Sequence, residues 1–488
     1  MNEEAIQGLK PERVWHYFKE ISAIPRGSKN EKAVLEYIKK TAAAMGLKVK
    51  QDKVGNVVVS KPASPGKEHS TTVVLQVHTD MVCEKNRDVQ HDFLKDGIKF
   101  HREGNYIKAE GTTLGSDDGI GVASLLSLLE DKSLVHGPIE GLFTIDEETG
   151  LTGANHIEPG FITGKVMMNL DSEDEGVLYI GCAGGLDTTI SIPVKRKAVT
   201  GKVAVLNVMI RGLKGGHSGV DIHLGRANAL KLLTRTLLAI DAKTKMKMRL
   251  VSLEGGSKHN AIPREAEAVI IVPVADEAKV EKAAAECEQV FKNAFSSTDP
   301  DVRVLVEKGK KPKPAFDDES KAAVLDALNA IPHGVIRMSS DIPDLVETST
   351  NLAVLKTSAA GVAIVTSQRS SIESEKDMIA AHVASVGKLA GGKIKPSDGY
   401  PGWQPNVSSA VLGKGKEVYR NLYGKDPQVK AIHAGLECGI INDRVGGGVD
   451  TISFGPTIIG PHSPDERVAV DSVEKFYKYL TEIVKSVA

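Results

Sequence analysis

The stretch TVVLQVHTD, residues 72–80, carries a nearly unbroken apolar segment directly into a histidine and an aspartate. An apolar segment of this kind is typical of a strand that is buried on both faces of a sheet. The pattern returns in LFTIDEE, residues 142–148, and in VMMNLD, residues 166–171, where carboxylates follow the apolar part. Such strands alternate with segments of helical periodicity, so the sequence predicts an α/β fold, a mixed sheet flanked by helices.

The pattern of the chain changes after about residue 182. Segments 186–194 and 203–211 alternate polar and apolar residues, as half-exposed strands do, and a long helix is expected at 226–241. We therefore predict a discontinuous catalytic domain, residues 1–186 and 399–488, with an inserted α+β lid domain at residues 187–398. A chain of 488 residues is also too long for a single hydrophobic core.

Composition narrows the range of partners and compartments. The net charge of −1 argues against nucleic acid or an anionic membrane as the main partner. Four scattered cysteines form neither a disulfide framework nor a thiolate zinc site. The first ten residues show no signal-peptide pattern, and no apolar segment approaches the roughly 20 residues of a membrane-spanning helix. We expect a cytoplasmic protein with small-molecule partners.

Candidate metal ligands stand where the three predicted strands end. His78, the pair Glu147 and Glu148, and Asp171 each follow one of these strands. In open α/β sheets, ligands bind beyond the carboxyl ends of the strands, so these side chains are expected to meet at one edge. Histidine and carboxylate ligands without cysteine suit a catalytic zinc site rather than a structural one.

Two further patterns suggest a division of roles within this site. His78 and Asp80 are two residues apart and share one face of a strand, so Asp80 can accept a hydrogen bond from the second ring nitrogen of His78. In the Glu147-Glu148 pair, one carboxylate can bind metal while the other takes a proton from water.

These residues belong to a longer series of motifs along the chain. The sequence resembles the co-catalytic dizinc exopeptidases, a family that includes bacterial aminoacyl-histidine dipeptidases, peptidase T, peptidase V, carnosinases and aminoacylase. The motifs that carry the resemblance are His78-Thr79-Asp80, Leu114-Gly115-Ser116-Asp117-Asp118-Gly119, Asp146-Glu147-Glu148-Thr149-Gly150, Asn169-Leu170-Asp171, Gly215-Gly216-His217-Ser218-Gly219, Asn260-Ala261-Ile262-Pro263, and Gly455-Pro456 followed by His462.

The resemblance implies a set of metal ligands. His78 and Asp171 are expected to hold one zinc, Glu148 and His462 the other, and Asp117 to bridge both. The cofactor is then two zinc ions per chain, with cobalt or manganese as substitutes. The strand pattern alone does not decide which of the adjacent Asp117 and Asp118 bridges; that assignment follows from the resemblance, which also implies a cis peptide bond between them.

The resemblance also implies roles for residues that do not bind metal. Glu147 is expected to be the general base and Asp80 to orient His78. His217 is expected to stabilise the tetrahedral oxyanion. Three residues are expected to contact the substrate: Asn260 as a lid residue, Arg369 at the free carboxylate, and Glu437 at the α-amine.

The expected activity is zinc-dependent hydrolysis of unblocked dipeptides, including those ending in histidine. The sequence leaves two alternatives open: an aminoacylase or amide deacylase on the same fold, and a non-catalytic zinc-binding scaffold. A glutamate that binds no metal would be of no use to a scaffold. The sequence also leaves open a homodimer, in which His217 could act in its own subunit or in the second.

Overall fold

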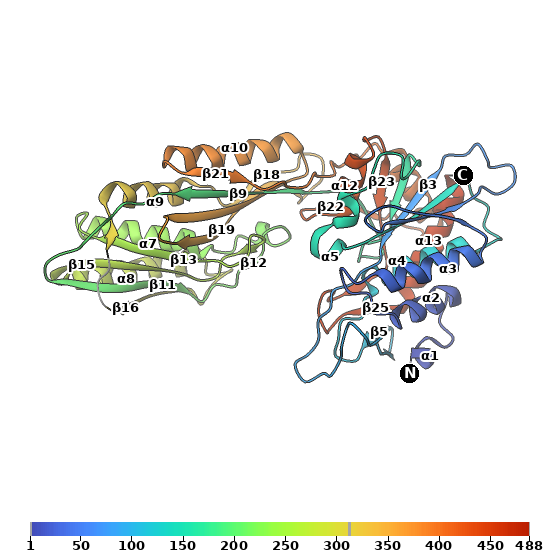
Figure 1. The fold of residues 1–488 in the computed structure, drawn as a ribbon, viewed down its shortest axis with the longest axis horizontal. Helices are drawn as coiled ribbons and strands as arrows, with labels where there is room; N and C mark the ends of the chain where they lie inside the picture. The colour runs from blue at the N-terminus through green and yellow to red at the C-terminus, as the bar shows by residue number, and fades with distance from the viewer. Residues whose placement is uncertain (1, 311–313, 488) are drawn as a thin grey trace. The chain divides into compact units, whose positions relative to one another are not determined.

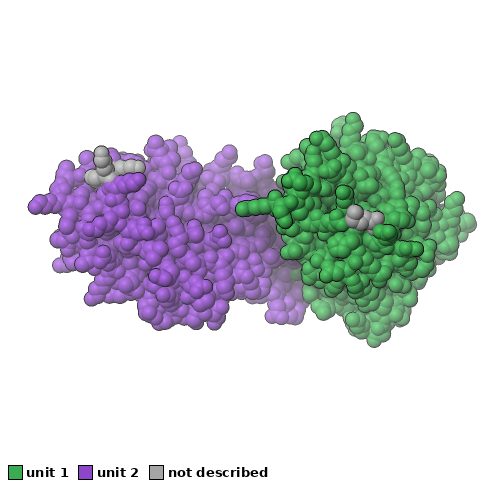
Figure 2. Space-filling view, turned by 90° about the horizontal axis from the view of Figure 1, so that it is seen from below, with its two compact units in different colours: residues 1–181, 403–431, 436–488 green, residues 182–402, 432–435 purple. Residues whose placement is uncertain are grey.

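The computed structural model describes residues 2–310 and 314–487, and the chain folds into two compact units (Figure 2). Unit 1 consists of Met1–Gly181, Trp403–Ala431 and Leu436–Ala488. Unit 2 consists of Cys182–Gly402 and Ile432–Gly435. The chain therefore leaves unit 1 and returns to it twice.

Unit 1 is built on an eight-stranded mixed sheet (Figure 1). Its strand order is β1 (Lys48–Gln51), β2 (Val57–Lys61), β6 (Ile139–Thr144), β3 (Val73–His78), β7 (Val166–Asn169), β23 (Asp450–Ser453), β8 (Val177–Cys182) and β22 (Gln428–Ile432). The four central strands β6, β3, β7 and β23 are parallel to their neighbours among these four, while β1, β2 and β8 are antiparallel. All six residues of β3 and all six of β6 are buried, as the apolar segments predict.

The helices of unit 1 are mostly amphipathic, but α4 (Ser116–Glu130) is buried along nearly its whole length. It packs on α2 (Glu12–Ser22) and β3, and its small residues allow this close approach. The other helices are α1 (Asn2–Ile6), α3 (Lys32–Ala44), α5 (Glu147–Gly150), α6 (Thr152–Asn155), α11 (Ala410–Tyr423), α12 (Glu437–Arg444) and α13 (Val470–Ser486). A small antiparallel sheet joins β24 (Ile458–Ile459), β25 (Arg467–Ala469), β5 (Tyr106–Ala109) and β4 (Phe100–Glu103).

Unit 2 contains a nine-stranded antiparallel sheet. Its strands are β16 (Arg303–Lys308), β11 (Val203–Arg211), β15 (Ala266–Pro273), β13 (Arg249–Gly255), β19 (Val346–Thr357), β20 (Val362–Ser370), β9 (Gly184–Ile192) and β21 (Lys393–Pro396) in order, with β18 (Gly334–Met338) beside β19. The helices are α7 (Ala229–Lys243), α8 (Glu277–Ala294), α9 (Asp318–Ala330) and α10 (Glu373–Leu389), and they share one apolar core with the sheet. Short pairs join β12 (Gly216–His217) to β14 (Ala261–Ile262), and β10 (Arg196–Lys197) to β17 (Ala315–Phe316).

The structure confirms the predicted fold class: a mixed α/β sheet with helices, and an inserted α+β part with an antiparallel sheet. The domain boundaries expected at 186/187 and 398/399 stay a prediction. The division into two units rests on compactness alone, and it also assigns residues 432–435 to unit 2. The helix expected at 226–241 begins at Ala229, because Asn228 caps it through its side-chain oxygen. Across residues 2–310 and 314–487, no helix combines the length and apolar character needed to cross a membrane.

Candidate metal centre

The carboxyl ends of three parallel strands bring the predicted ligands together in unit 1. His78 is the last residue of β3, Glu147 and Glu148 begin α5 shortly after β6, and Asp171 follows β7 by two residues. Candidate ligand atoms form three overlapping groups, and within each group the atoms lie within 4.8 Å of one another. The groups are His78 with Glu147 and Glu148, His78 with Asp117 and Asp171, and Asp117 with Glu148 and His462. The strand-end expectation therefore produces one compact cluster.

The two carboxylate oxygens of Asp117 face two different histidines. Its Oδ1 lies 3.1 Å from Nε2 of His78, and its Oδ2 lies 3.1 Å from Nε2 of His462. Each histidine has a second carboxylate beside it: Asp171 is 3.3 Å from His78, and Glu148 is 3.0 Å from His462. This is the arrangement that a carboxylate shared between two neighbouring cations requires.

The adjacent Asp118 has a different environment. Its Oδ2 accepts a hydrogen bond from the backbone N–H of His78 at 3.2 Å, and its Oδ1 accepts one from Gly121 at 3.1 Å. Its carboxylate is thus engaged with the backbone, while that of Asp117 faces the histidines. The peptide bond between the two aspartates is cis, which confirms the expectation from the resemblance.

Asp80 connects the first histidine to the loop that carries the glutamates. Its Oδ1 lies 3.4 Å from Nδ1 of His78. The same carboxylate accepts hydrogen bonds from the backbone N–H groups of Glu147 (3.0 Å) and Glu148 (3.2 Å) and from the hydroxyl of Ser28 (2.8 Å). Burial raises the pKa of Asp80, but the neighbouring His78 and hydrogen bonds from Ser28 and Glu147 outweigh it and lower the pKa to about 2.

The electrostatics of the cluster suit bound cations. Burial raises the pKa of Asp171 to about 7 and that of Glu173 to about 8, and it raises the pKa of Glu147 well above its ordinary value. Carboxyl groups behave this way where burial and neighbouring carboxylates leave their charge uncompensated. One buried oxygen of Glu148, Oε1, has no hydrogen-bond partner in the described part of the chain. Two histidines and several carboxylates without sulfur are a donor set that fits zinc and similar divalent ions.

His217 lies in unit 2, where its neighbours fix the protonation of its ring. It pairs with Ala261 across the short β12–β14 ladder, and Ser218 donates to the carbonyl of Asn260 (2.9 Å). Its Nδ1 accepts hydrogen bonds from the backbone N–H groups of Gly219 and Val220, both at 3.2 Å. A ring nitrogen that accepts carries no proton, so the neutral ring carries its proton on Nε2. Burial lowers the pKa of His217, with the charge of Arg369 adding to the effect, and favours this neutral form.

Arg369 lies near the end of β20, and its side chain is buried. It donates from one terminal nitrogen to the hydroxyl of Tyr400 at 3.0 Å, while its Nε has no partner among the described residues. The ring of Tyr400 lies against Gly185 and Gly435, where an added Cβ would come within 2.6 and 3.0 Å of it. The guanidinium of Arg369 is therefore positioned by Tyr400, and its remaining N–H donors can bind an anionic group.

Glu437 starts α12 and is fully buried in unit 1. Its Oε2 accepts hydrogen bonds from the amide of Gln76 and the hydroxyl of Thr144, both at 2.6 Å. Its Oε1 has no partner among the described residues. One oxygen is thus committed to the sheet, and burial raises the pKa of this carboxyl to about 8.

Sequence reasoning missed three polar side chains that support the cluster. Gln76 joins Glu437 to Asn169 through hydrogen bonds of 2.6 Å each. Arg26 and Glu466 are buried beside the segments that carry the ligands. Only Gln76 left a signal, as a polar residue inside the apolar segment 73–77. The other two lie far along the chain from their contacts.

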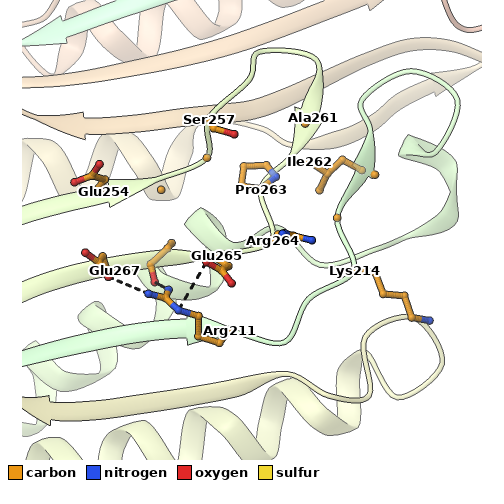
Figure 3. A pocket seen from close by; sticks show the side chains of 15 residues that line it. Arg211, Lys214, Glu254, Ser257, Ala261, Ile262, Pro263, Arg264, Glu265 and Glu267 are labelled. Carbon is orange, nitrogen blue, oxygen red and sulfur yellow. Dashed lines mark hydrogen bonds and ion pairs between the residues drawn. The ribbon is translucent and has the colours of Figure 1, made fainter. Parts of the chain in front are cut away.

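A separate pocket of about 660 Å³ lies within unit 2 (Figure 3). It contains no predicted ligand, although Gly216 and Ala261 in its wall neighbour His217 and Asn260. Its wall carries both charges, and Arg211 is paired with Glu267 at 2.9 Å. A wall of mixed and paired charges does not define a ligand, so the chemistry centres on the cluster in unit 1.

Comparison with known proteins gives the class of this fold. Residues 208–299 match the family model described as a peptidase dimerisation domain. The fold also resembles an M20 family metallo-carboxypeptidase from Sulfolobus solfataricus, with a TM-score of 0.51 at 14% identity over 98% of this chain and 99% of that one. The architecture is that of the M20 metallopeptidases.

Two relatives match over almost their full length. The cytosol non-specific dipeptidase of Escherichia coli (strain K12) is 42% identical over 480 residues, which is 98% of either chain. The crystal structure of aminoacylhistidine dipeptidase from Vibrio alginolyticus has a TM-score of 0.91 at 40% identity and covers 100% of this chain and 99% of that one. The chain therefore belongs to the M20 family branch that contains the cytosol non-specific dipeptidase.

Proposed function

We propose that this chain is a dipeptidase that uses two divalent metal ions, with zinc as the expected metal, to hydrolyse unblocked dipeptides, including those with C-terminal histidine. The observation that carries the proposal is Asp117, whose two oxygens face separate histidine–carboxylate groups 3.1 Å away on each side. The dipeptidases similar to this chain over nearly its whole length support the substrate class.

In this proposal His78 and Asp171 would hold one ion, Glu148 and His462 would hold the other, and Asp117 would contact both. Two ions held there would polarise the scissile carbonyl and lower the pKa of a water molecule. The chain's own residues then perform the proton transfers and the binding.

Glu147 takes a proton from the attacking water and delivers it to the leaving amine. Asp80 holds the ring of His78 in orientation through Nδ1. His217 donates from Nε2–H to the oxyanion as it develops, Arg369 pairs with the free carboxylate of the substrate, and Asn260 contacts the substrate. Glu437 is the candidate for the α-amine through its uncommitted oxygen.

The experiment is amino-acid release from a panel of dipeptides by the purified full chain, with metal content measured in parallel. Free dipeptides should be cleaved, N-acetylated and C-amidated versions poorly, and a chelator should abolish cleavage. Preferential cleavage of N-acylated amino acids would instead identify an amide deacylase. Binding of two ions without cleavage of either class would identify a scaffold.

We also propose that the protein works in the cytoplasm and forms a homodimer. The first rests on the likeness to a dipeptidase named for the cytosol, and the second on the match of residues 208–299 to a peptidase dimerisation domain. Light scattering coupled to size exclusion tests the oligomeric state, since a homodimer has twice the 52.1 kDa mass of one chain.

A further inference from the structure

Two charged side chains that belong to no ligand group are buried beside the metal centre. Arg26 lies between α2 and α3, and Glu466 lies just before β25. Each is only 2% exposed, although charged side chains are rarely buried unless they are paired or fully hydrogen-bonded. What each one contacts shows why burial is tolerated.

The carboxylate of Glu466 sits in a concave run of backbone amides at the start of α4. Its Oε2 accepts hydrogen bonds from the N–H groups of Leu114 (2.8 Å) and Gly115 (3.0 Å). Its Oε1 accepts from the N–H groups of Ser116 (2.7 Å) and Asp117 (3.4 Å), and from the Ser116 hydroxyl (2.6 Å). Four consecutive amides can point at one anion because Gly115 adopts a left-handed conformation with φ of 68°.

Arg26 binds backbone carbonyl groups in the same region, whereas Glu466 binds backbone N–H groups. Its guanidinium donates to the carbonyl oxygens of Thr79 (3.1 Å) and Asp80 (2.7 Å), and also to that of Gly115. An added Cβ on Gly115 would come within 2.7 Å of the guanidinium, and one on Gly119 within 2.6 Å. The arginine therefore fills a space that two glycines leave open.

These contacts reach three segments that carry candidate ligands. Arg26 fixes the backbone immediately after His78, and both side chains fix the turn before Asp117. Glu466 is four residues after His462, so its carboxylate ties the His462 loop to the backbone of Asp117. Charge-assisted hydrogen bonds of this kind are stronger and more directional than neutral ones.

We propose that Glu466 and Arg26 are positioning residues that set the spacing of His78, Asp117 and His462 before any metal binds. This proposal rests on the metal centre of the proposed function. Residues that orient metal ligands without touching the metal commonly change metal affinity or activity by 10–100-fold when they are altered, so an effect of about that size on metal binding is expected.

Glu466→Gln is the main test, because it keeps the shape of the side chain and removes its charge. Glu140→Gln is the matched control. Glu140 is also a buried carboxylate of unit 1, and it accepts hydrogen bonds from the N–H groups of Thr163 (2.7 Å) and Gly164 (3.1 Å) and from the Thr163 hydroxyl (2.9 Å). It contacts no candidate ligand in these bonds. A third variant, Arg26→Lys, keeps the charge but loses the branched donor that reaches three carbonyls.

Zinc affinity is measured on the metal-stripped full chain by competition with a chromogenic chelator, and backbone amide hydrogen exchange is followed over residues 114–117 in the same metal-free samples. Glu466→Gln should weaken zinc binding by about 10–100-fold and speed exchange at 114–117. Arg26→Lys should weaken zinc binding in the same direction. Glu140→Gln should lower the unfolding temperature while leaving zinc affinity and exchange at 114–117 unchanged.

Two results would overturn the proposal. One is an unchanged zinc affinity in Glu466→Gln while the unaltered chain binds two zinc ions. The other is a loss of affinity in Glu140→Gln equal to that in Glu466→Gln, which would reduce both residues to general stabilisers. Neither readout involves peptide hydrolysis, so failure of the dipeptidase proposal would be recognised separately by absent cleavage with normal zinc binding.

Discussion

Glu147 and Glu148 are neighbours with different surroundings. Oε2 of Glu148 lies 3.0 Å from Nε2 of His462. Glu147 lies beside His78, and burial raises the pKa of the Glu147 carboxyl group well above its ordinary value. A carboxyl group with a raised pKa suits a general base that must hold a proton and release it.

Glu147→Ala is expected to lower kcat by about 10²–10⁴-fold, because the proton acceptor is lost while the ligands remain. Metal content by mass spectrometry should stay at two ions per chain. Glu148→Ala is the matched comparison and should lose metal. Near-normal kcat in Glu147→Ala, or loss of its metal, would show that the two roles are assigned wrongly.

Asp117→Ala is expected to remove more metal than Asp171→Ala. Asp117 has one oxygen 3.1 Å from each of the two histidines, whereas Asp171 lies beside His78 only. Inductively coupled plasma mass spectrometry of the two dialysed variants measures the difference. Equal metal content in both would contradict the bridging position of Asp117.

His217→Ala is expected to lower kcat by about 10²–10³-fold with little change in KM and none in metal content. Its Nε2–H would act mainly when the carbonyl oxygen becomes negative, so its loss falls on the chemical step. Arg369→Ala should instead raise KM for free dipeptides and narrow the gap to their amides. His223→Ala, an exposed histidine nearby in sequence, serves as the control and should change neither constant. A pure KM effect in His217→Ala would reassign that residue to substrate binding.

At the scale of elements, the sequence predicted those candidate ligands that stand at the ends of regular strands. His78, Glu148 and Asp171 could be found because an apolar segment ends and a polar side chain follows. Asp117 and Asp118 could not be distinguished, since adjacent carboxylates in one loop have the same sequence pattern and differ only in which one meets the histidines. Glu466 was beyond reach because its partners at 114–117 are about 350 residues away.

His333 lies beside the start of α7 although it is 105 residues from Asn228 in sequence, so no sequence pattern could interpret it. The side-chain oxygen of Asn228 accepts the N–H groups of Leu230 and Lys231, which leaves its amide nitrogen to donate. That nitrogen lies 2.8 Å from the carbonyl of Leu352 and 3.3 Å from Nδ1 of His333. Because the amide nitrogen only donates, His333 must accept, and so its Nδ1 is unprotonated.

Acid should therefore destabilise this part of unit 2. Burial lowers the pKa of His333 to about 4, below the ordinary value of about 6.5 in the unfolded chain. Between these values the unfolded chain binds more protons, so the free energy of unfolding falls as the pH is lowered from about 6.5 to 4. The loss from this one group between pH 7 and pH 5 should be on the order of 1 kcal/mol. Urea unfolding of the chain and of His333→Gln at both pH values measures it, and an equal pH dependence in the two would contradict the assignment.

At the scale of the whole molecule, all five candidate ligands lie in unit 1. A ligand that binds only the folded state stabilises that state. Removing metal with a chelator should therefore lower the unfolding temperature of unit 1 and leave that of unit 2 unchanged. Hydrogen exchange resolved by peptide distinguishes the units, and equal loss of protection in both would contradict a metal site confined to unit 1.

Residues 432–435 belong to unit 2, although the segments on both sides of them belong to unit 1. Unit 2 is therefore not formed by one continuous segment of the chain. The N–H of Ala183 bonds to the carbonyls of Ile432 and Ala434 at 3.0 Å each, and His433 bonds to the Ser349 hydroxyl at 2.7 Å. A gene fragment encoding 182–402 alone would omit these partners. The Ser349 hydroxyl would lose its hydrogen bond to His433, and the ring of Tyr400 would lose its packing against Gly435. The segment 182–402 thus does not contain all of unit 2. Exchanging unit 2 between relatives would require exchanging the tetrapeptide 432–435 as well. Recombination that moves only one of the two segments should yield poorly folded chimaeras.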